Sequence, residues 1–134
     1  MKWLVFFLCL LWFLKPLNAE TRIAIIDSGF SNFKQFKLCS PVKTFRGSVG
    51  HSYMDHGNMV LEVLHDFLPK NSEVCYILVD VFNNDGDVTV YDIARGVDYA
   101  IEQGANIINM SIEGSFYSFT EFNAIKRAMD KKIL

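Results

Sequence analysis

The sequence lacks the excess of basic residues that a nucleic-acid-binding surface requires. Thirteen lysines and arginines stand against 15 aspartates and glutamates, which gives a formal net charge of −2. Prolines number only three, glycines eight, and no linker, low-complexity tract or internal repeat divides the 134 residues. We therefore expect no nucleic-acid partner and no more than one domain.

Long hydrophobic runs are also scarce, and the one present lies at the N-terminus. Lys2 precedes an unbroken apolar run from Trp3 to Leu14, which is too short to span a bilayer, since a spanning helix needs about 20 residues. The polar stretch that follows ends at the small residue Ala19. This pattern predicts a signal peptide over residues 1–19, cut after Ala19, and an exported chain without a stable membrane anchor, secreted or periplasmic. An uncleaved signal anchor is the alternative.

Cysteine is rare as well, with three in the sequence. Cys9 would leave with the signal peptide, so Cys39 and Cys75 would remain as a pair in an oxidising compartment. The sequence leaves two possibilities open, a disulfide or two buried thiols, because spacing alone does not show whether the two side chains meet.

The exported residues 20–134 alternate between strand and helix patterns. Residues 22–26 (R-I-A-I-I) form a short apolar run of the kind found in a buried parallel strand, and residues 74–82 and 105–110 are similar. Helices are predicted to begin near His56, Thr89 and Ser118, the last two at capping-box patterns. This order predicts an α/β fold, a parallel sheet with flanking helices.

Helical spacing also predicts which side chains of each helix face the core. The three predicted inner faces are Val60, Val63, Leu64 and Phe67 in the first helix, Ile93, Val97 and Ala100 in the second, and Phe122, Ile125 and Met129 in the third. A new apolar run begins at Ile133, where a next strand would start, so we expect the sequence to be a truncated domain.

Two short motifs carry candidate chemistry. Asp27 closes the first strand before Gly29, and in open α/β sheets the functional crevice lies beyond the carboxyl ends of the strands. His56 opens a helix, where the helix dipole opposes a positive charge on an imidazole, and Gly57 leaves room for a close neighbour. Taken singly, Asp27 could be a turn cap and His56 a surface residue, which is how we interpret His51 and His65.

The order of these motifs resembles the subtilase family of serine peptidases. The matching segments are I-A-I-I-D-S-G at 23–29, D-H-G-N-M-V at 55–60, and the stretch from N-D-G-D to N-M-S-I-E-G at 84–114. They cover nearly all of the exported chain and correspond to about the first half of the family's catalytic domain. The resemblance implies a subtilisin-like three-layer fold, serine endopeptidase activity and a peptide or protein as substrate.

The resemblance also implies a role for particular residues. Asp27 would orient the imidazole of His56, and His56 would be the general base of a catalytic triad. Ser111, Ile112, Glu113 and Gly114 would form the strand end that lines the substrate pocket. The run Asn83–Asp87 has the composition of a calcium loop but not the spacing of an EF-hand, so we expect a turn there, no metal and no cofactor.

The sequence departs from the family pattern in three places. Asn58-Met59 follows His-Gly where the family has a small hydroxyl residue and a histidine, Leu61-Glu62 replaces small residues, and Glu113 replaces a glycine. The Gly-x-Ser segment of the nucleophile and the oxyanion asparagine do not occur in these residues. Loss of the serine from such a triad costs on the order of 10⁶ in turnover.

Three hypotheses follow from this combination. The first is a fragment of a secreted serine endopeptidase that is inactive alone. The second is a non-catalytic secreted module that binds peptides or proteins on a degenerate subtilase fold. The third is an unrelated α/β domain in which Asp27 binds a metal or accepts a phosphoryl group.

Overall fold

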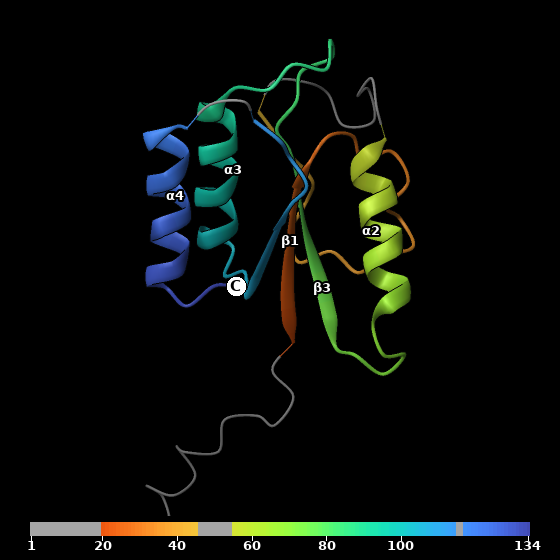
Figure 1. Cartoon of the computed structure of the whole chain (residues 1–134). Coiled ribbons are helices and arrows are strands. Elements are labelled where there is room, and N and C mark those ends of the chain that lie inside the picture. Colours follow the sequence, from red (N-terminus) through yellow and green to blue (C-terminus); the bar gives the residue numbers. More distant parts are fainter. Residues whose placement is uncertain (1–19, 46–54, 115–116) are drawn as a thin grey trace, which may run out of the picture.

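A computed structural model describes residues 20–45, 55–114 and 117–134 (Figure 1). The predicted signal peptide over residues 1–19 and its cut after Ala19 lie outside these ranges, as does His51. Within them, no helix has the length and apolar character needed to cross a membrane.

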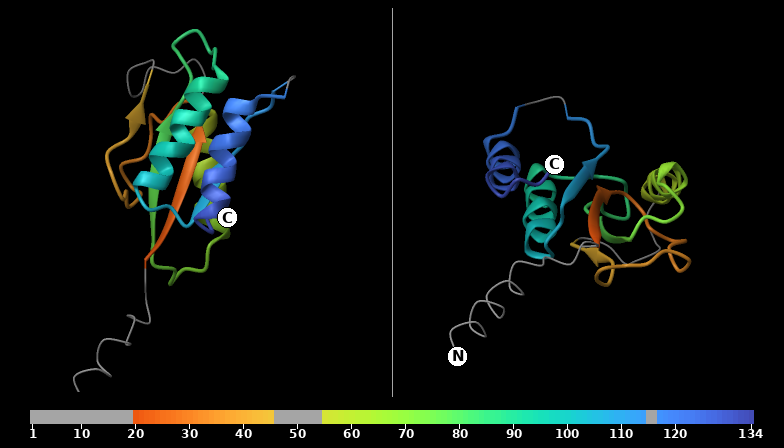
Figure 2. Two further views of the ribbon diagram at one scale, coloured as in Figure 1. Left: turned by 90° about the vertical axis from the view of Figure 1, so that its left-hand side faces the viewer. Right: turned by 90° about the horizontal axis from the view of Figure 1, so that it is seen from below.

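The described residues form an α/β fold of three layers, as the sequence predicts. A parallel sheet with the strand order β2-β3-β1-β4 has α3 and α4 on one face and α2 on the other (Figures 1 and 2). The elements are β1 (Thr21–Asp27), β2 (Lys43–Thr44), α2 (His56–Phe67), β3 (Val74–Asp80), α3 (Val90–Glu102), β4 (Ile107–Met110) and α4 (Phe119–Asp130). The two-residue strand β2 lies in the long connection between β1 and α2.

The centre of the sheet is the pairing of β1 with β3. Their register runs from Thr21 opposite Val74 to Asp27 opposite Asp80, so the two strands end level with each other. Both strands are buried on both faces, which explains why their sequences are almost continuously apolar rather than alternating. The carboxyl ends of β1 and β3 therefore meet at one edge of the sheet.

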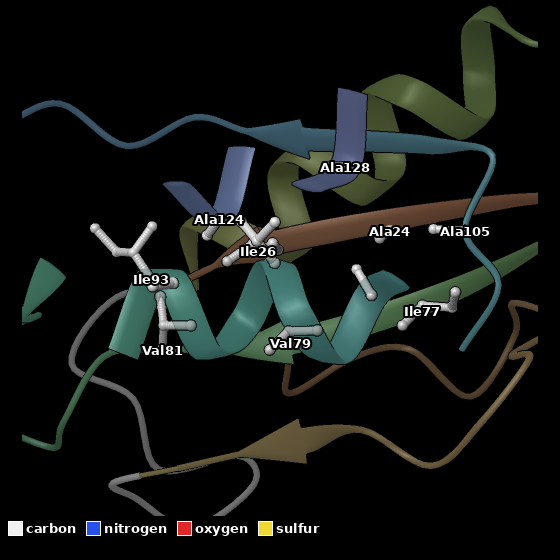
Figure 3. Packing of buried hydrophobic residues seen from close by; sticks show 12 residues of the cluster. Ala24, Ile26, Ile77, Val79, Val81, Ile93, Ala105, Ala124 and Ala128 are labelled. Carbon is white, nitrogen blue, oxygen red and sulfur yellow. The ribbon is translucent and has the colours of Figure 1, made fainter. Parts of the chain in front are cut away.

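Helix α3 covers the first face of the sheet in the predicted orientation. Ile93, Val97 and Ala100 are buried against a cluster that includes Ile26 and Val79 (Figure 3). Thr89 caps the N-terminus of the helix, since its hydroxyl accepts a hydrogen bond from the Asp92 main chain at 3.2 Å. Gly104, with a φ of 72°, follows the other end. The capping signals in the sequence therefore locate both ends of α3.

The predicted inner face of α4 is wrong, although Ser118 caps the N-terminus of the helix as expected. Ala124 and Ala128 are buried, while Phe122 is 49% and Met129 66% exposed and Ile125 is half-buried. Small side chains four residues apart let α4 lie close against α3 (Figure 2). The contact between the two helices therefore sets the rotation of α4 about its own axis, and in this rotation its largest apolar side chains are not buried.

The predicted inner face of α2 is correct only in part. Among the apolar side chains of this helix Leu61 is fully buried, with Val60 and Leu64 packed partly against the same cluster. Val63 and Phe67, which were predicted to face the core, are 57% and 86% exposed. The close approach of the N-terminus of α2 to the loop after β1, described below, fixes a different rotation of the helix.

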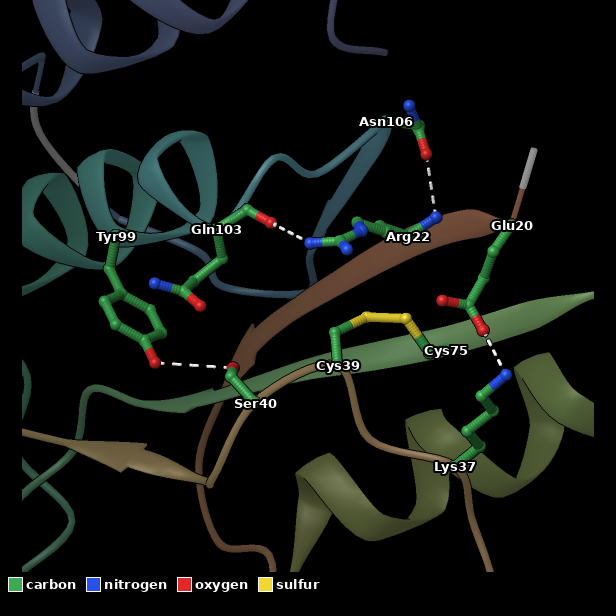
Figure 4. The surroundings of a disulfide bond; sticks show 9 residues. All are labelled: Glu20, Arg22, Lys37, Cys39, Ser40, Cys75, Tyr99, Gln103 and Asn106. Carbon is green, nitrogen blue, oxygen red and sulfur yellow. Dashed lines mark hydrogen bonds and ion pairs between the residues drawn. A yellow bond between two sulfur atoms is a disulfide. The ribbon is translucent and has the colours of Figure 1, made fainter. Parts of the chain in front are cut away.

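Cys39 and Cys75 form a disulfide, which resolves the alternative that the sequence left open (Figure 4). Their Cα atoms lie 5.2 Å apart. The segment before β2 runs beside β3 here, since the Cys39 amide donates to the Tyr76 carbonyl at 2.8 Å and the Tyr76 amide donates to the Lys37 carbonyl at 2.9 Å. The cross-link therefore fastens the irregular segment after β1 to the central strand β3.

Removal of this disulfide should destabilise the fold. The two cysteines are 36 residues apart, and a cross-link over a loop of this size stabilises by about 2–4 kcal/mol through the entropy of the unfolded chain. We expect the double variant Cys39→Ala, Cys75→Ala to lose this amount in the free energy of unfolding measured in urea. Peptide mapping without reduction that recovers Cys39 and Cys75 only as separate thiols would contradict the pairing.

Candidate active site

The predicted pair Asp27 and His56 lies in direct contact. Asp27 is the last residue of β1 and its side chain is 2% exposed, whereas His56 is the first residue of α2 and its side chain is 37% exposed. The ring nitrogen Nδ1 of His56 lies 2.7 Å from Oδ1 of Asp27. The structure thus brings these two residues together from positions 29 apart in the sequence, while their catalytic roles stay a prediction.

The geometry of the pair determines which ring nitrogen can accept a proton. A carboxylate oxygen only accepts hydrogen bonds, so the neutral ring of His56 carries its hydrogen on Nδ1 and leaves the lone pair on Nε2. The same Oδ1 also accepts the main-chain N–H of Ser28 at 2.7 Å. These two donors, together with the Ser28 hydroxyl at 3.5 Å, hold one oxygen of Asp27. No described residue is hydrogen-bonded to Nε2 of the ring, which can therefore act as a base.

The second oxygen of Asp27, Oδ2, is buried and has no hydrogen-bond partner within the described ranges. The main chain of Asp27 is fixed independently, because its carbonyl accepts the amide of Val81 at 3.1 Å from the end of β3. The backbone of the sheet, rather than the carboxylate, therefore determines where Asp27 lies.

The N-terminus of α2 is pressed against the loop that follows β1. The amide of Gly57 donates to the carbonyl of Ser28 at 2.6 Å, and a Cβ atom at Gly57 would lie 2.7 Å from both that oxygen and the ring of Phe30. Gly57 therefore makes room for this chain's own backbone and aromatic ring, and this contact places His56 beside Asp27.

Asn58, one of the departures from the family pattern, reinforces the same contact. Its side chain is buried, and with its oxygen directed toward the loop it accepts the amides of Ser31 and Asn32 at 3.1 and 3.0 Å. The side chain of Asp55, the residue before the helix, makes no capping hydrogen bond. Asn58 thus attaches the first turn of α2 to the loop after β1.

Asp27 and His56 border a cleft of about 270 Å³ at the carboxyl edge of the sheet. Three of the four residues predicted to bind substrate, Ser111, Ile112 and Glu113, line this cleft after the end of β4. Gly114 does not line it, and no other described residue has an atom within 4 Å of the position of a Cβ atom there. Substrate binding by these residues stays a prediction.

The other residues that line the cleft were not predicted from the sequence. Ser28, Phe82, Gly86 and Val88 also line it, the last three from the connection between β3 and α3. That connection contains the predicted turn, in which the Asn83 side chain accepts the amides of Asp85 and Asp87 at 3.0 and 2.8 Å. The order of the predicted elements could have indicated these residues, since a connection that leaves the carboxyl end of a central parallel strand borders the crevice.

A second buried carboxyl group, Asp80, lies beside Asp27 and was also missed. Asp80 is opposite Asp27 in the register of β1 and β3, and its two oxygens accept the amides of Gly29 and Phe82 at 3.2 and 3.1 Å. Burial raises the pKa of Asp80, and the charge of Asp27 raises it further, against the lowering effect of the two amides. Asp80 helps to hold the turn at Gly29, where φ is 63°.

Solved structures with the same arrangement of elements are subtilisin-like proteases. A mutant of the protease domain of PatA matches with a TM-score of 0.66 and 21% identity, covering 90% of this chain and 50% of that one. A subtilisin-like protease, Apa1, from the Antarctic psychrotroph Pseudoalteromonas sp. AS-11 matches with a TM-score of 0.62 and 25% identity, covering 85% and 30%. The prenylagaramide maturation protease PagA matches with a TM-score of 0.59 and 20% identity, covering 85% and 44%.

These matches establish the fold of the chain, which corresponds to only a part of the length of each matched protein. The chain spans half or less of the length of these three proteins. No protein-family model and no curated protein matches the sequence. The chain has the fold of subtilisin-like proteases and corresponds to a partial domain of that kind.

Substitution of Gly57 should break the contact that positions His56. In Gly57→Ala the new methyl group would collide with the Ser28 carbonyl, which cannot move without displacing the strand end, so we expect a loss of about 1–3 kcal/mol in the free energy of unfolding. Gly114→Ala is the matched control, because its Cβ would meet open space, and it should change stability by no more than about 0.5 kcal/mol. Equal urea midpoints for the two variants would show that the close approach at Gly57 is not required.

The raised pKa of Asp80 predicts a pH dependence of stability. Because the folded protein holds this proton more tightly than the unfolded chain does, the stability contributed by Asp80 is greatest at low pH. This contribution to stability should decrease as the pH rises above 3.8, the ordinary pKa of an aspartate side chain, toward the raised pKa of Asp80. Asp80→Asn should remove this decline, so its stability relative to the unchanged chain should increase with pH. A difference that stays constant or decreases between about pH 4 and 7 would contradict the raised pKa.

Proposed function

We propose that this chain is the part of a secreted subtilisin-like serine endopeptidase that carries the acid and the base of the catalytic triad, and that it does not hydrolyse peptides alone. The observation that supports this most strongly is the 2.7 Å contact between Asp27 and His56, at the edge of a subtilisin-like sheet and beside a cleft. The apolar run and Ala19 in residues 1–19 support export.

In the proposed reaction His56 accepts the proton of a serine hydroxyl through Nε2 while that oxygen attacks a peptide carbonyl. Asp27 keeps the ring in the required tautomer and stabilises the imidazolium that forms. The low exposure of Asp27 favours this electrostatic role, because an ion pair interacts more strongly away from water. The serine itself is supplied by polypeptide outside residues 1–134.

The serines near Asp27 and His56 are poorly placed to replace that nucleophile. Ser28 is buried, and its hydroxyl lies 3.5 Å from Asp27 rather than beside the imidazole. The hydroxyl of Ser111 accepts the side-chain amide of Asn109 at 3.1 Å. Within the described ranges neither serine is hydrogen-bonded to His56.

An apolar hollow next to His56 supports the idea that further polypeptide completes the site. The hollow has a volume of about 530 Å³ and lies between α2 and the end of β4. Met59, Val63 and Phe67 of α2 line it and are more than half exposed. Exposed apolar surface of this kind is typical of a face that another segment covers, and a segment placed there would reach the His56 ring, which borders the same hollow.

A non-catalytic peptide-binding module is the second candidate. The observation that favours it is the cleft itself, which this chain forms from its own residues between the end of β4 and the β3–α3 connection. In that case Asp27 and His56 would contribute to binding only. The two candidates differ in whether a serine is ever activated beside His56.

An active-site serine probe tests the proposal. We expect a fluorophosphonate to leave the 134-residue chain unlabelled, because loss of the nucleophile from a triad costs on the order of 10⁶ in turnover. An extended product of the same gene that contains a Gly-x-Ser segment should be labelled, and labelling should disappear in its His56→Ala variant. Stoichiometric labelling of the 134-residue chain that His56→Ala abolishes would contradict the proposal, since the chain would then contain its own nucleophile.

A further inference from the structure

The charged groups of the cleft beside Asp27 and His56 are predominantly negative. Two carboxylates line it, those of Asp27 and Glu113, together with the imidazole of His56. No lysine or arginine is among the described residues that line it. Asp85 and Asp87, which are exposed on either side of the lining residue Gly86, add two negative charges at the rim. The field in the cleft therefore favours a cation and opposes an anion.

The two lining carboxylates differ in their availability to a ligand. Asp27 is buried and already contacts His56. Glu113 is exposed and, within the described ranges, forms no ion pair with a lysine, arginine or histidine. Glu113 is therefore the acidic side chain of the cleft that can meet a ligand without first giving up another charged partner.

The remaining walls of the cleft are apolar and firmly supported. Phe82, Val88 and Ile112 line it and pack partly against the core beneath α3. An apolar wall combined with a carboxylate in the same cleft suits a side chain with an aliphatic stem and a positive head, which is the structure of arginine and lysine. The cleft volume of about 270 Å³ is slightly below the usual range for drug-sized ligands, so it fits a single side chain of a peptide.

We infer that Glu113 makes this cleft selective for peptides that place an arginine or lysine side chain in it. The inference rests on the proposed function, because it assigns the cleft to a peptide, and it adds the class of side chain that is recognised. Glu113 acts here as a specificity-determining residue, since its carboxylate would contact the ligand and not the reacting atoms.

Binding of matched peptides to the 134-residue chain tests the inference without requiring activity. The probes are two acetylated, amidated tetrapeptides, Ala-Ala-Ala-Arg and Ala-Ala-Ala-citrulline. Citrulline has nearly the shape of arginine without its charge. Chemical-shift changes at the amides of Ser111 and Glu113 report binding in the cleft, and their titration gives the dissociation constants.

The chain offers matched variants for the protein side of the same comparison. Glu113→Gln removes the charge and keeps the shape, while Glu102→Gln removes an equal charge from an exposed position at the end of α3. We expect arginine to bind about 3-fold to 10-fold more tightly than citrulline in the unchanged chain and in Glu102→Gln. In Glu113→Gln the preference should be clearly smaller, because only the charges of Asp27, Asp85 and Asp87 remain. The preference should decrease when salt is raised from about 0.05 M to about 0.5 M.

The outcomes separate failure of the inference from failure of the proposed function. Equal affinity for the two peptides in the unchanged chain, or a preference of undiminished size in Glu113→Gln, would overturn the role of Glu113 and leave the cleft as a peptide site. Absence of any shift at Ser111 and Glu113 with either peptide would overturn the cleft as a peptide site. The part of the proposed function that concerns substrate binding in this cleft would then be contradicted as well.

Discussion

The hydrogen bond from the amide of Gly57 to the carbonyl of Ser28 is the contact on which the candidate site depends. At 2.6 Å it brings the first turn of α2 against the loop after β1, and only a residue without a side chain permits that distance. Asn58 secures the same approach from the next position through the amides of the loop. With both backbones held, the ring of His56 lies beside the carboxylate of Asp27 without any need for the two side chains to attract each other first.

The sheet supplies the other half of the arrangement. Because β1, β3 and β4 run parallel, their carboxyl ends lie at one edge, and this edge carries Asp27, Asp80 and Ser111 from three separate parts of the sequence. The same edge concentrates negative charge, in part buried and in part exposed. A fold of this kind separates stability, which resides in the apolar strands, from the candidate site, which lies at the ends of the strands and in the elements that follow them.

Much of this arrangement was predictable from the sequence, and the exceptions have physical causes. β1 and α3 were found because a short apolar run and a capping box are local signals. The inner faces of α2 and α4 were mispredicted, because helical spacing favours burying large side chains, whereas contacts with other segments bury Leu61, Ala124 and Ala128 instead. The Cys39–Cys75 bond and the wall formed by Phe82 and Val88 depend on which segments become neighbours in space, which spacing alone does not determine.

The alternation of side chains along β1 has a consequence for how this chain can evolve. Ile23 and Ile25 point toward α2 with Asp27, while Ala24 and Ile26 point toward α3. Gain or loss of a single codon within this strand would leave an apolar segment still able to pair with β3, yet it would turn the carboxylate to the opposite side of the sheet. Insertions and deletions should therefore occur in the connections and not in β1. The reason is that they would move the carboxylate of Asp27 to the other face of the sheet, even where the strand still folds.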